Sequence, residues 1–274
     1  MATTPTPHSH QDARPPAVAG LFYPGEAAGL DRTVDDLLKH ARAHDATPVP
    51  KALIAPHAGY VYSGPIAANA YRLLAPARDR VTRVVLLGPT HRVAVRGLAI
   101  PAVPRFATPL GSVELDTAAI ESLRGMPQVV VSDEAHALEH SLEVHLPFLQ
   151  KVLTRFTLVP LAVGYASAED VAAVLDRLWG GPETLIVVSS DLSHYLAYAH
   201  AQSVDRETCK AILELRTDID HEQACGATPV SGLTLTARRK GLKPELIDLR
   251  NSGDTAGDKS RVVGYASFAF YESP

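Results

Sequence analysis

Ala52-Leu53-Ile54-Ala55-Pro56-His57 is an apolar run that ends in a proline and a histidine. Two later stretches repeat this design: Val84-Val85-Leu86-Leu87-Gly88-Pro89-Thr90-His91 and Leu185-Ile186-Val187-Val188-Ser189-Ser190-Asp191-Leu192-Ser193-His194. Each run is typical of a buried strand in an α/β sheet. Each histidine therefore follows the carboxyl end of a strand, where open α/β sheets bind ligands. Three imidazoles delivered to that edge predict a metal site or an acid/base site.

Composition limits the classes of function. The chain has 274 residues, 46% of them hydrophobic, which is enough for one large core. Its net charge is −4, whereas nucleic-acid binders carry a clearly basic surface, so we expect no nucleic-acid partner. We expect no membrane span because no apolar run reaches about 18 residues. The two cysteines, Cys209 and Cys225, indicate free thiols in a cytoplasmic protein.

Strand-like and helix-like segments alternate along the chain, and no linker divides it. We therefore expect a single α/β domain over residues 14–274, with a mostly parallel central sheet flanked by helices. The polar, proline-rich residues 1–13 are expected to be a disordered tail. The pattern predicts strands at 52–55, 82–88, 129–131, 156–163, 184–189, 244–250 and 261–271, and irregular or edge strands within 93–115. It predicts helices at 29–44, 63–74, 116–123, 141–153, 168–178, 199–215 and 228–239.

The first two histidines point to a shared site. Gly59 and Gly64 allow a tight turn after the first strand, and Tyr62 is a candidate hydrogen-bonding neighbour of His57. Taken alone, His57 is explained equally well as a core histidine that ends a strand. His91 repeats the geometry on the next predicted strand, which favours a site to which both contribute.

The third stretch adds Asp191 and His194. Asp191 is a candidate to orient an imidazole or to bind a metal, and the alternative is that it caps a helix that follows. His194 is a candidate general acid/base because an unperturbed imidazole titrates at about pH 6.5.

A dense polar cluster comprises His136, Glu139, His140, Glu143 and His145. On a helix, residues four apart share a face, which would pair His136 with His140. The zinc-binding pattern His-Glu-x-x-His is absent, so a role behind the ligands or in the cleft wall is as well supported as ligation. We assign that role to His140, Glu143 and His145.

Cys225 precedes a predicted helix that begins near Thr228. The helix dipole there favours a thiolate, and a thiolate with two imidazoles is a reasonable ligand set for a divalent transition metal. The alternative is a buried, inert cysteine, which is what we expect of Cys209.

Together these elements resemble the Memo family, called AmmeMemoRadiSam system protein B in prokaryotes. The resemblance keeps the same order from about residue 14 to about residue 271. It is carried by residues 14–24, 56–64, 88–91, 108–111, 139–148, 189–195, 225–226, 252–254 and 263–265.

The Memo family is similar in structure to the class III extradiol dioxygenases, the LigB-like non-haem iron enzymes, so the resemblance implies that fold. Those enzymes bind Fe(II) with two histidines and a glutamate, and a further histidine is the acid/base. The resemblance implies that His57 and His91 are metal ligands and that Cys225 replaces the glutamate. It also places His194 at the acid/base position with Asp191 beside it, and we add Tyr62 to this catalytic group.

We therefore expect a Memo-like metal-binding protein with a dioxygenase-like cleft, an oxidoreductase that acts on a small molecule. Fe(II) is the first expected metal, and Cu or Zn are alternatives because a thiolate softens the ligand set. Since fold does not fix function, a second hypothesis is a non-catalytic adaptor whose cleft binds a peptide or another ligand. A third is a metal-assisted hydrolase. The family name also implies functional links to AMMECR-type and radical SAM proteins.

Overall fold

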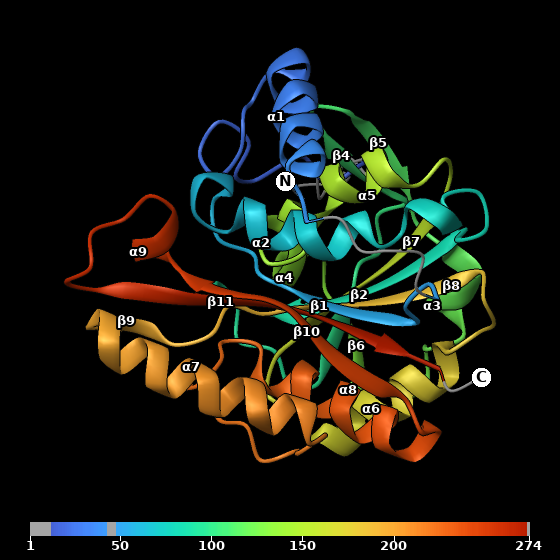
Figure 1. Ribbon diagram of the computed structural model, residues 1–274. Helices are drawn as coiled ribbons and strands as arrows, with labels where there is room; N and C mark the ends of the chain where they lie inside the picture. Colours follow the sequence, from blue (N-terminus) through green and yellow to red (C-terminus); the bar gives the residue numbers. More distant parts are fainter. Residues whose placement is uncertain (1–11, 43–47, 273–274) are drawn as a thin grey trace, which may run out of the picture.

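A computed structural model describes residues 12–42 and 48–272 of the chain. The predicted disordered tail lies outside the described residues, apart from Asp12 and Ala13. The described residues form one α/β domain in which helices cover both faces of a central sheet (Figure 1). This architecture confirms the predicted fold class.

In the part of the chain that the structure describes, the central sheet has nine strands. Four neighbouring strands at its centre run parallel, and an antiparallel pairing follows on either side of them. The strands are β1 (Ala52–Ala55), β2 (Arg83–Pro89), β3 (Leu98–Ile100), β6 (Val129–Val131), β7 (Thr157–Val163), β8 (Thr184–Ser189), β9 (His194–Leu196), β10 (Lys243–Asn251) and β11 (Val262–Tyr271). Their order is β10-β11-β1-β8-β2-β7-β3-β6, and β9 pairs with β11 off this path. The neighbours β1, β8, β2 and β7 run parallel, whereas β11 against β1 and β3 against β7 are antiparallel. The sheet is therefore parallel at its centre and mixed as a whole.

Helices form a layer on each side of the sheet. They are α1 (Ala27–Lys39), α2 (Tyr60–Arg72), α3 (Thr117–Glu121), α4 (Asp133–Ala137), α5 (Leu146–Val152), α6 (Ala168–Leu178), α7 (Tyr198–Leu213), α8 (Ala227–Lys240) and α9 (Ser252–Thr255). In Figure 1, α1, α2 and α5 lie above the sheet, and α6, α7 and α8 lie below it. A separate hairpin of β4 (Arg105–Thr108) and β5 (Gly111–Glu114) lies beside α5. None of the described helices is long and apolar enough to cross a membrane.

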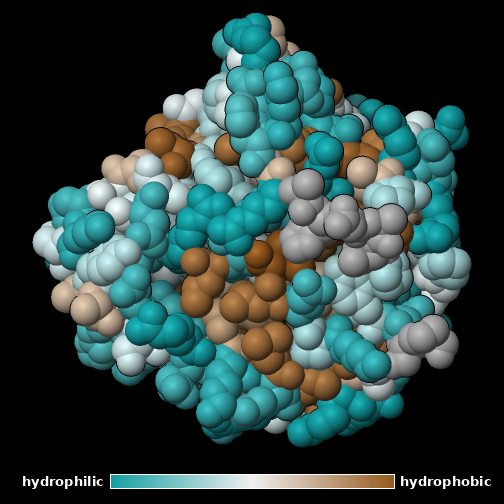
Figure 2. Space-filling view, in the orientation of Figure 1, coloured by the Kyte–Doolittle hydropathy of each residue, from teal (hydrophilic) through white to brown (hydrophobic). Residues whose placement is uncertain are grey.

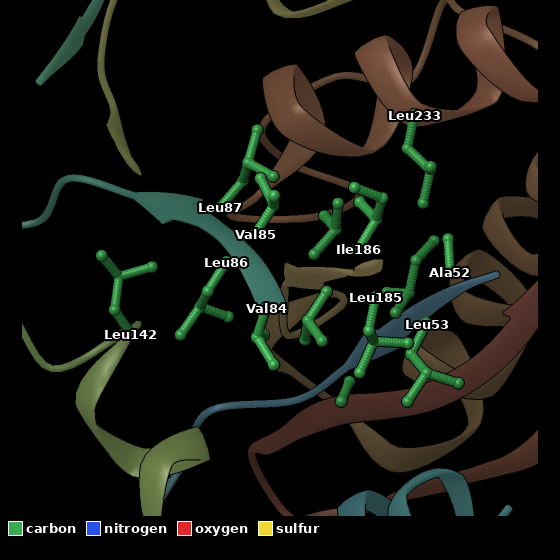
Figure 3. Packing of buried hydrophobic residues seen from close by; sticks show 14 of the residues in the cluster. Ala52, Leu53, Val84, Val85, Leu86, Leu87, Leu142, Leu185, Ile186 and Leu233 are labelled. Atoms are coloured by element: carbon green, nitrogen blue, oxygen red, sulfur yellow. The ribbon is translucent and has the colours of Figure 1, made fainter. Parts of the chain in front are cut away.

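The apolar runs that predict the strands are buried on both faces. Every residue of β1 and β8 is buried, and so are six of the seven residues of β2. In Figure 3, Val85 and Leu87 point toward the helix that carries Leu233, whereas Leu86 points toward Leu142 on the opposite face. Because successive side chains point to opposite faces and both faces are buried, the strands are apolar at every position rather than at every second one. On the outside, the space-filling view shows a band of hydrophobic residues over the edge strand β10, whose own apolar side chains are buried or half-buried (Figure 2).

Several predicted boundaries need correction. Helix α2 begins at Tyr60 rather than at Ser63, because Gly59 is its N-cap and the Ser63 hydroxyl donates to the carbonyl oxygen of Ala58. The N-cap of α8 is Gly226, so Thr228 lies inside the helix. The segment predicted as one helix over 141–153 is a 3-10 turn, Glu143–His145, followed by α5. Three short elements, α4, β9 and α9, follow no pattern that predicts them from the sequence.

Candidate functional site

The carboxyl ends of the adjacent strands β1, β8 and β2 bring distant histidines together. Ring centroids of His57 and His91 are 5.2 Å apart. His140 joins them, with its ring 5.5 Å from that of His57 and 4.6 Å from that of His91. One possible ligand atom from each of these three residues lies within 4.8 Å of the other two, the one such group of His, Cys, Asp or Glu found within residues 12–42 and 48–272.

The tautomer of His57 is fixed by a hydroxyl. Its Nδ1 lies 2.6 Å from Oγ of Ser189, which itself donates to the carbonyl oxygen of Ser141 at 2.6 Å. A hydroxyl has one proton, so Ser189 accepts from Nδ1–H of His57. Nε2 of His57 therefore carries a lone pair, and Sγ of Cys225 lies 3.4 Å from it. Burial, together with the neighbouring imidazoles, holds the pKa of His57 well below its usual value, so the ring is neutral.

A carboxylate fixes the second ring. Oε1 of Glu139 lies 2.8 Å from Nδ1 of His91, and Oε2 accepts the backbone N–H of the same residue. Burial opposes ionisation of Glu139, but the hydrogen bonds from the side chain and backbone of His91 and from the backbone of Ser141 outweigh burial and lower the pKa of Glu139 to about 2. An ionised carboxylate only accepts, so His91 donates from Nδ1 and keeps Nε2 free.

His140 was expected in the cleft wall, and the structure places it within the histidine group. Its Nδ1 lies 3.4 Å from Oε1 of Glu139. Burial lowers the pKa of His140 to about 4, against the opposing charge of Glu139. His57 and His140 are therefore neutral, which is the form in which histidine binds metals.

Cys225 lies at the border of this group and is not one of its three members. Its Sγ is 3.4 Å from Nε2 of His57 and accepts the backbone N–H of Asp191 at 3.3 Å. Burial, with a smaller contribution from the charge of Asp191, raises the pKa of Cys225 to about 12. The thiolate predicted from the helix N-terminus is therefore wrong for the protein without a metal.

Asp191 and His194 lie together next to the histidine group. Oδ1 of Asp191 accepts the backbone N–H of His57 at 2.7 Å, and burial raises the pKa of Asp191 to about 7. The chain continues from Asp191 into β9, so this residue does not cap a following helix. His194 is half-buried, and burial lowers its pKa.

Two cavities flank His194 and Tyr195, which line both. The first has a volume of about 770 Å³ and also reaches His140 and Asp191. Its aromatic walls are Phe22, Tyr23, Tyr60, Tyr62, Tyr195 and Tyr265, and none of the described residues that line it is Lys or Arg. The second, about 1000 Å³, reaches His91 and Cys225 and has a carboxylate-rich wall.

Glu143 and His145, which we expected behind the ligands or in the cleft wall, lie elsewhere. Glu143 is fully buried, where it pairs with Arg14 and accepts the Tyr23 hydroxyl. His145 is also fully buried, with Nδ1 2.8 Å from the Tyr71 hydroxyl. Neither lines the two cavities. Glu143 instead ties the N-terminal segment, which forms part of the first cavity's wall, to the segment that carries His140.

Sequence reasoning missed two residues of the site. Ser189 ends β8 at the predicted edge, and its position there was a usable signal. Tyr265 lies on β11 and lines the first cavity, and its hydroxyl has no hydrogen-bond partner among the described residues. Tyr62 also lines this cavity and is 40% exposed, and it does not bond to His57.

These features define an α/β protein with a partly buried histidine centre, suited to a metal, at the carboxyl edge of a mixed sheet. The chain belongs to the Memo family, because the model of the Memo-like protein family matches residues 14–269.

Relatives cover nearly the whole chain. A MEMO1 family protein of Aquifex aeolicus is 35% identical over 269 residues, which are 94% of this chain and 98% of that protein. One of Methanocaldococcus jannaschii is 36% identical over 280 residues, 93% of this chain and 97% of that protein. Among solved structures, an uncharacterized protein of Escherichia coli K12 matches with a TM-score of 0.48 and 15% identity, over 79% of this chain and 98% of that one.

Proposed function

We propose that this chain binds one divalent transition metal through His57, His91 and His140 and uses it, with Asp191 and His194, to act on a small molecule. The observation that carries the proposal is the group of three ligand atoms within 4.8 Å of one another. Small side-chain rotations would bring three nitrogens at that spacing to about 2.0–2.1 Å from one ion.

The residues present suit a borderline transition metal. Neutral imidazoles bind Fe, Cu and Zn, and three protein ligands leave positions open for a substrate. We propose Cys225 as a fourth donor because its Sγ is 3.4 Å from Nε2 of His57. Metal binding would then displace the thiol proton. Fe(II) is our first choice, with Cu or Zn as alternatives, and the bound metal would supply Lewis-acid or redox chemistry.

The chain's own acid/base groups face the first cavity. A neutral His194 can accept a proton, and Asp191, whose pKa is raised to about 7, can hold or release one at neutral pH. The open hydroxyls of Tyr62 and Tyr265 can hydrogen-bond a ligand. The aromatic walls and the absence of Lys and Arg among the described lining residues favour an uncharged, largely apolar substrate. We propose dioxygenase-like oxidation as the class of reaction.

Metal analysis tests the proposal directly. Protein purified without oxygen would be offered Fe(II), Cu or Zn, and we expect about one ion per chain for the wild type. His57→Ala and His140→Ala should lose the ion. His200→Ala is the matched control, since His200 is exposed and lies outside the histidine group. A wild type without stoichiometric metal, or a His57→Ala variant that binds equally well, would overturn the proposal.

A second candidate is a peptide-binding adaptor, and one observation favours it. Exposed apolar side chains line the first cavity: Leu21 is 81% exposed, Val61 65% and Tyr195 63%. Such a patch suits an apolar peptide side chain. Titration of candidate peptides against wild type and Val61→Asp separates the two functions. Binding that Val61→Asp abolishes, without any turnover by the metal-loaded protein, supports the adaptor.

A further inference from the structure

A single carboxylate serves two of the three histidines. Glu139 is 2% exposed, and its Oε1 lies 2.8 Å from Nδ1 of His91 and 3.4 Å from Nδ1 of His140. The same carboxylate accepts the backbone N–H groups of His91, His140 and Ser141. Within the described residues, no Lys or Arg forms an ion pair with it. Its negative charge therefore acts mainly on the imidazoles of His91 and His140.

The backbone contacts make Glu139 a rigid anchor. Three N–H groups hold its two oxygens in place, so the carboxylate does not depend on the imidazoles for its orientation. Because an ionised carboxylate has no proton to donate, the imidazole nitrogens that face it must carry hydrogen. His91 is thereby held as the Nδ1–H tautomer, with a lone pair on Nε2, and the carboxylate 3.4 Å from Nδ1 of His140 favours the same tautomer there.

The shared charge also acts on a bound cation. A carboxylate behind a metal-bound imidazole raises the donor strength of the other ring nitrogen and orients the ring. Glu139 does this for two rings at once, whereas Ser189, a neutral group, serves His57 alone. The charge of Glu139 would also offset part of the charge of a divalent ion held by these histidines.

We infer that Glu139 is the positioning residue of the centre, which fixes the tautomer of His91, favours the same tautomer of His140 and thereby sets the metal affinity. This inference rests on the proposed metal-binding function. Glu139 does not touch the metal itself, since its oxygens are occupied on the far side of the rings. Its removal should therefore weaken binding without removing any ligand.

The experiment compares wild type, Glu139→Gln and Glu134→Gln by Zn²⁺ competition against a chromophoric chelator. Glu134 is exposed on the neighbouring helix α4 and is the matched control. We expect Glu139→Gln to weaken Zn²⁺ binding by about 10- to 100-fold and Glu134→Gln to leave it unchanged. Glu139→Gln affinity within about threefold of wild type would overturn the inference. A wild type that binds no Zn²⁺ would overturn the proposed function instead.

A second measurement needs no metal, and its main result comes from the wild type. Nitrogen-15 NMR of the metal-free wild type reports which ring nitrogen of each histidine carries the proton. We expect protonation at Nδ1 for His91 and His140, and a shift toward Nε2 in Glu139→Gln, which a merely structural role would not produce. Protonation at Nε2 of His91 in the wild type would overturn the inference even if Glu139→Gln fails to fold.

Discussion

The hydroxyl of Ser189 binds Nδ1 of His57 at 2.6 Å while donating its own proton to the carbonyl oxygen of Ser141, also at 2.6 Å. Ser189 is the last residue of β8, and His57 follows the neighbouring strand β1, so the sheet itself sets the position of this ring. Because the Ser189 hydroxyl donates its only proton to Ser141, the proton in the bond between Ser189 and His57 must come from Nδ1 of His57. The result is an Nε2 lone pair presented to the histidine group.

Ser189→Ala should therefore weaken metal binding only through its effect on the ring of His57. We expect about a tenfold loss of Zn²⁺ affinity, because His57 can then adopt the Nε2–H tautomer. Loss of the buried hydroxyl should also lower the free energy of unfolding by about 1 kcal/mol. Chelator competition and urea unfolding measure the two effects. Ser112→Ala, at an exposed serine of β5, should change neither, and unchanged Zn²⁺ affinity in Ser189→Ala would contradict the assigned tautomer.

The part of the site that lies on regular strands could be predicted from the sequence. Continuous apolar runs specify parallel strands, and parallel neighbours end at one edge, which brings His57 and His91 together. His140 follows an irregular path, and no periodicity describes that path. The expected helical pairing of His136 with His140 is wrong because α4 ends at Ala137, and His136 instead bonds to the carbonyl oxygen of Ala99.

The ionisation of Cys225 could not be predicted for a different reason. A helix N-terminus stabilises a negative charge by about 0.3–1 kcal/mol when the charge is near the surface. Burial of a thiolate costs more than this, and burial is decided by tertiary packing rather than by local sequence. The raised pKa of Cys225 reflects that balance.

Gly88 is required by close packing at the end of β2. A Cβ there would lie 2.8 Å from Oγ of Ser141, 2.9 Å from Cδ2 of Leu142 and 3.1 Å from Cβ of Ser189. Gly88→Ala should lower the free energy of unfolding by about 1–3 kcal/mol and disturb the hydroxyl that holds His57. Urea unfolding measures the first effect and Zn²⁺ competition the second.

Gly29→Ala is the matched control for Gly88→Ala. Gly29 lies within α1, where the nearest atom to a new Cβ is Cβ of Pro24 at 3.4 Å. Because alanine is the better helix former, we expect a gain of about 0.5–1 kcal/mol. Equal stability of Gly88→Ala and wild type would show that the end of β2 can relax around a methyl group.

Asp191 should make the metal-free protein less stable as pH rises. Its pKa is raised by burial from 3.8 to about 7, so the folded state keeps a proton that the unfolded state loses between these values. Stability from this group is complete below about pH 4 and is lost as pH rises to about 7. Buried neutral histidines such as His145, whose pKa burial lowers to about 3, act in the opposite direction as pH falls below 6.5.

Asp191→Asn isolates this contribution. The asparagine can still accept the backbone N–H of His57, but it does not titrate. Urea unfolding at about pH 5 and about pH 8 should show that the variant loses less stability than wild type between the two values. Asp79→Asn, at an exposed carboxylate, should behave as wild type does. Identical pH dependence for Asp191→Asn and wild type would refute the raised pKa.

Glu143 holds the N-terminal segment through a buried ion pair with Arg14. Glu143→Gln leaves the guanidinium without its charge partner, and we expect a loss of about 3–5 kcal/mol in the free energy of unfolding. The exposed pair of Arg105 and Glu114 is the control, and Glu114→Gln should cost less than about 1 kcal/mol. Urea unfolding gives both values, and limited proteolysis should cut residues 14–24 faster in Glu143→Gln. Equal losses for Glu143→Gln and Glu114→Gln would mean that the buried pair stabilises the fold no more than the exposed pair does.

Tyr195 keeps a strained backbone between the two cavities. Its φ is +59°, in the left-handed region, while its side chain is 63% exposed. This conformation costs a non-glycine residue about 1–2 kcal/mol, which exceeds the entropic cost of glycine of about 0.5–1 kcal/mol. Tyr195→Gly should therefore be at least as stable as wild type, whereas Tyr165→Gly, at another exposed tyrosine with an ordinary φ, should lose stability. If urea unfolding shows equal losses for both, the strain is absent.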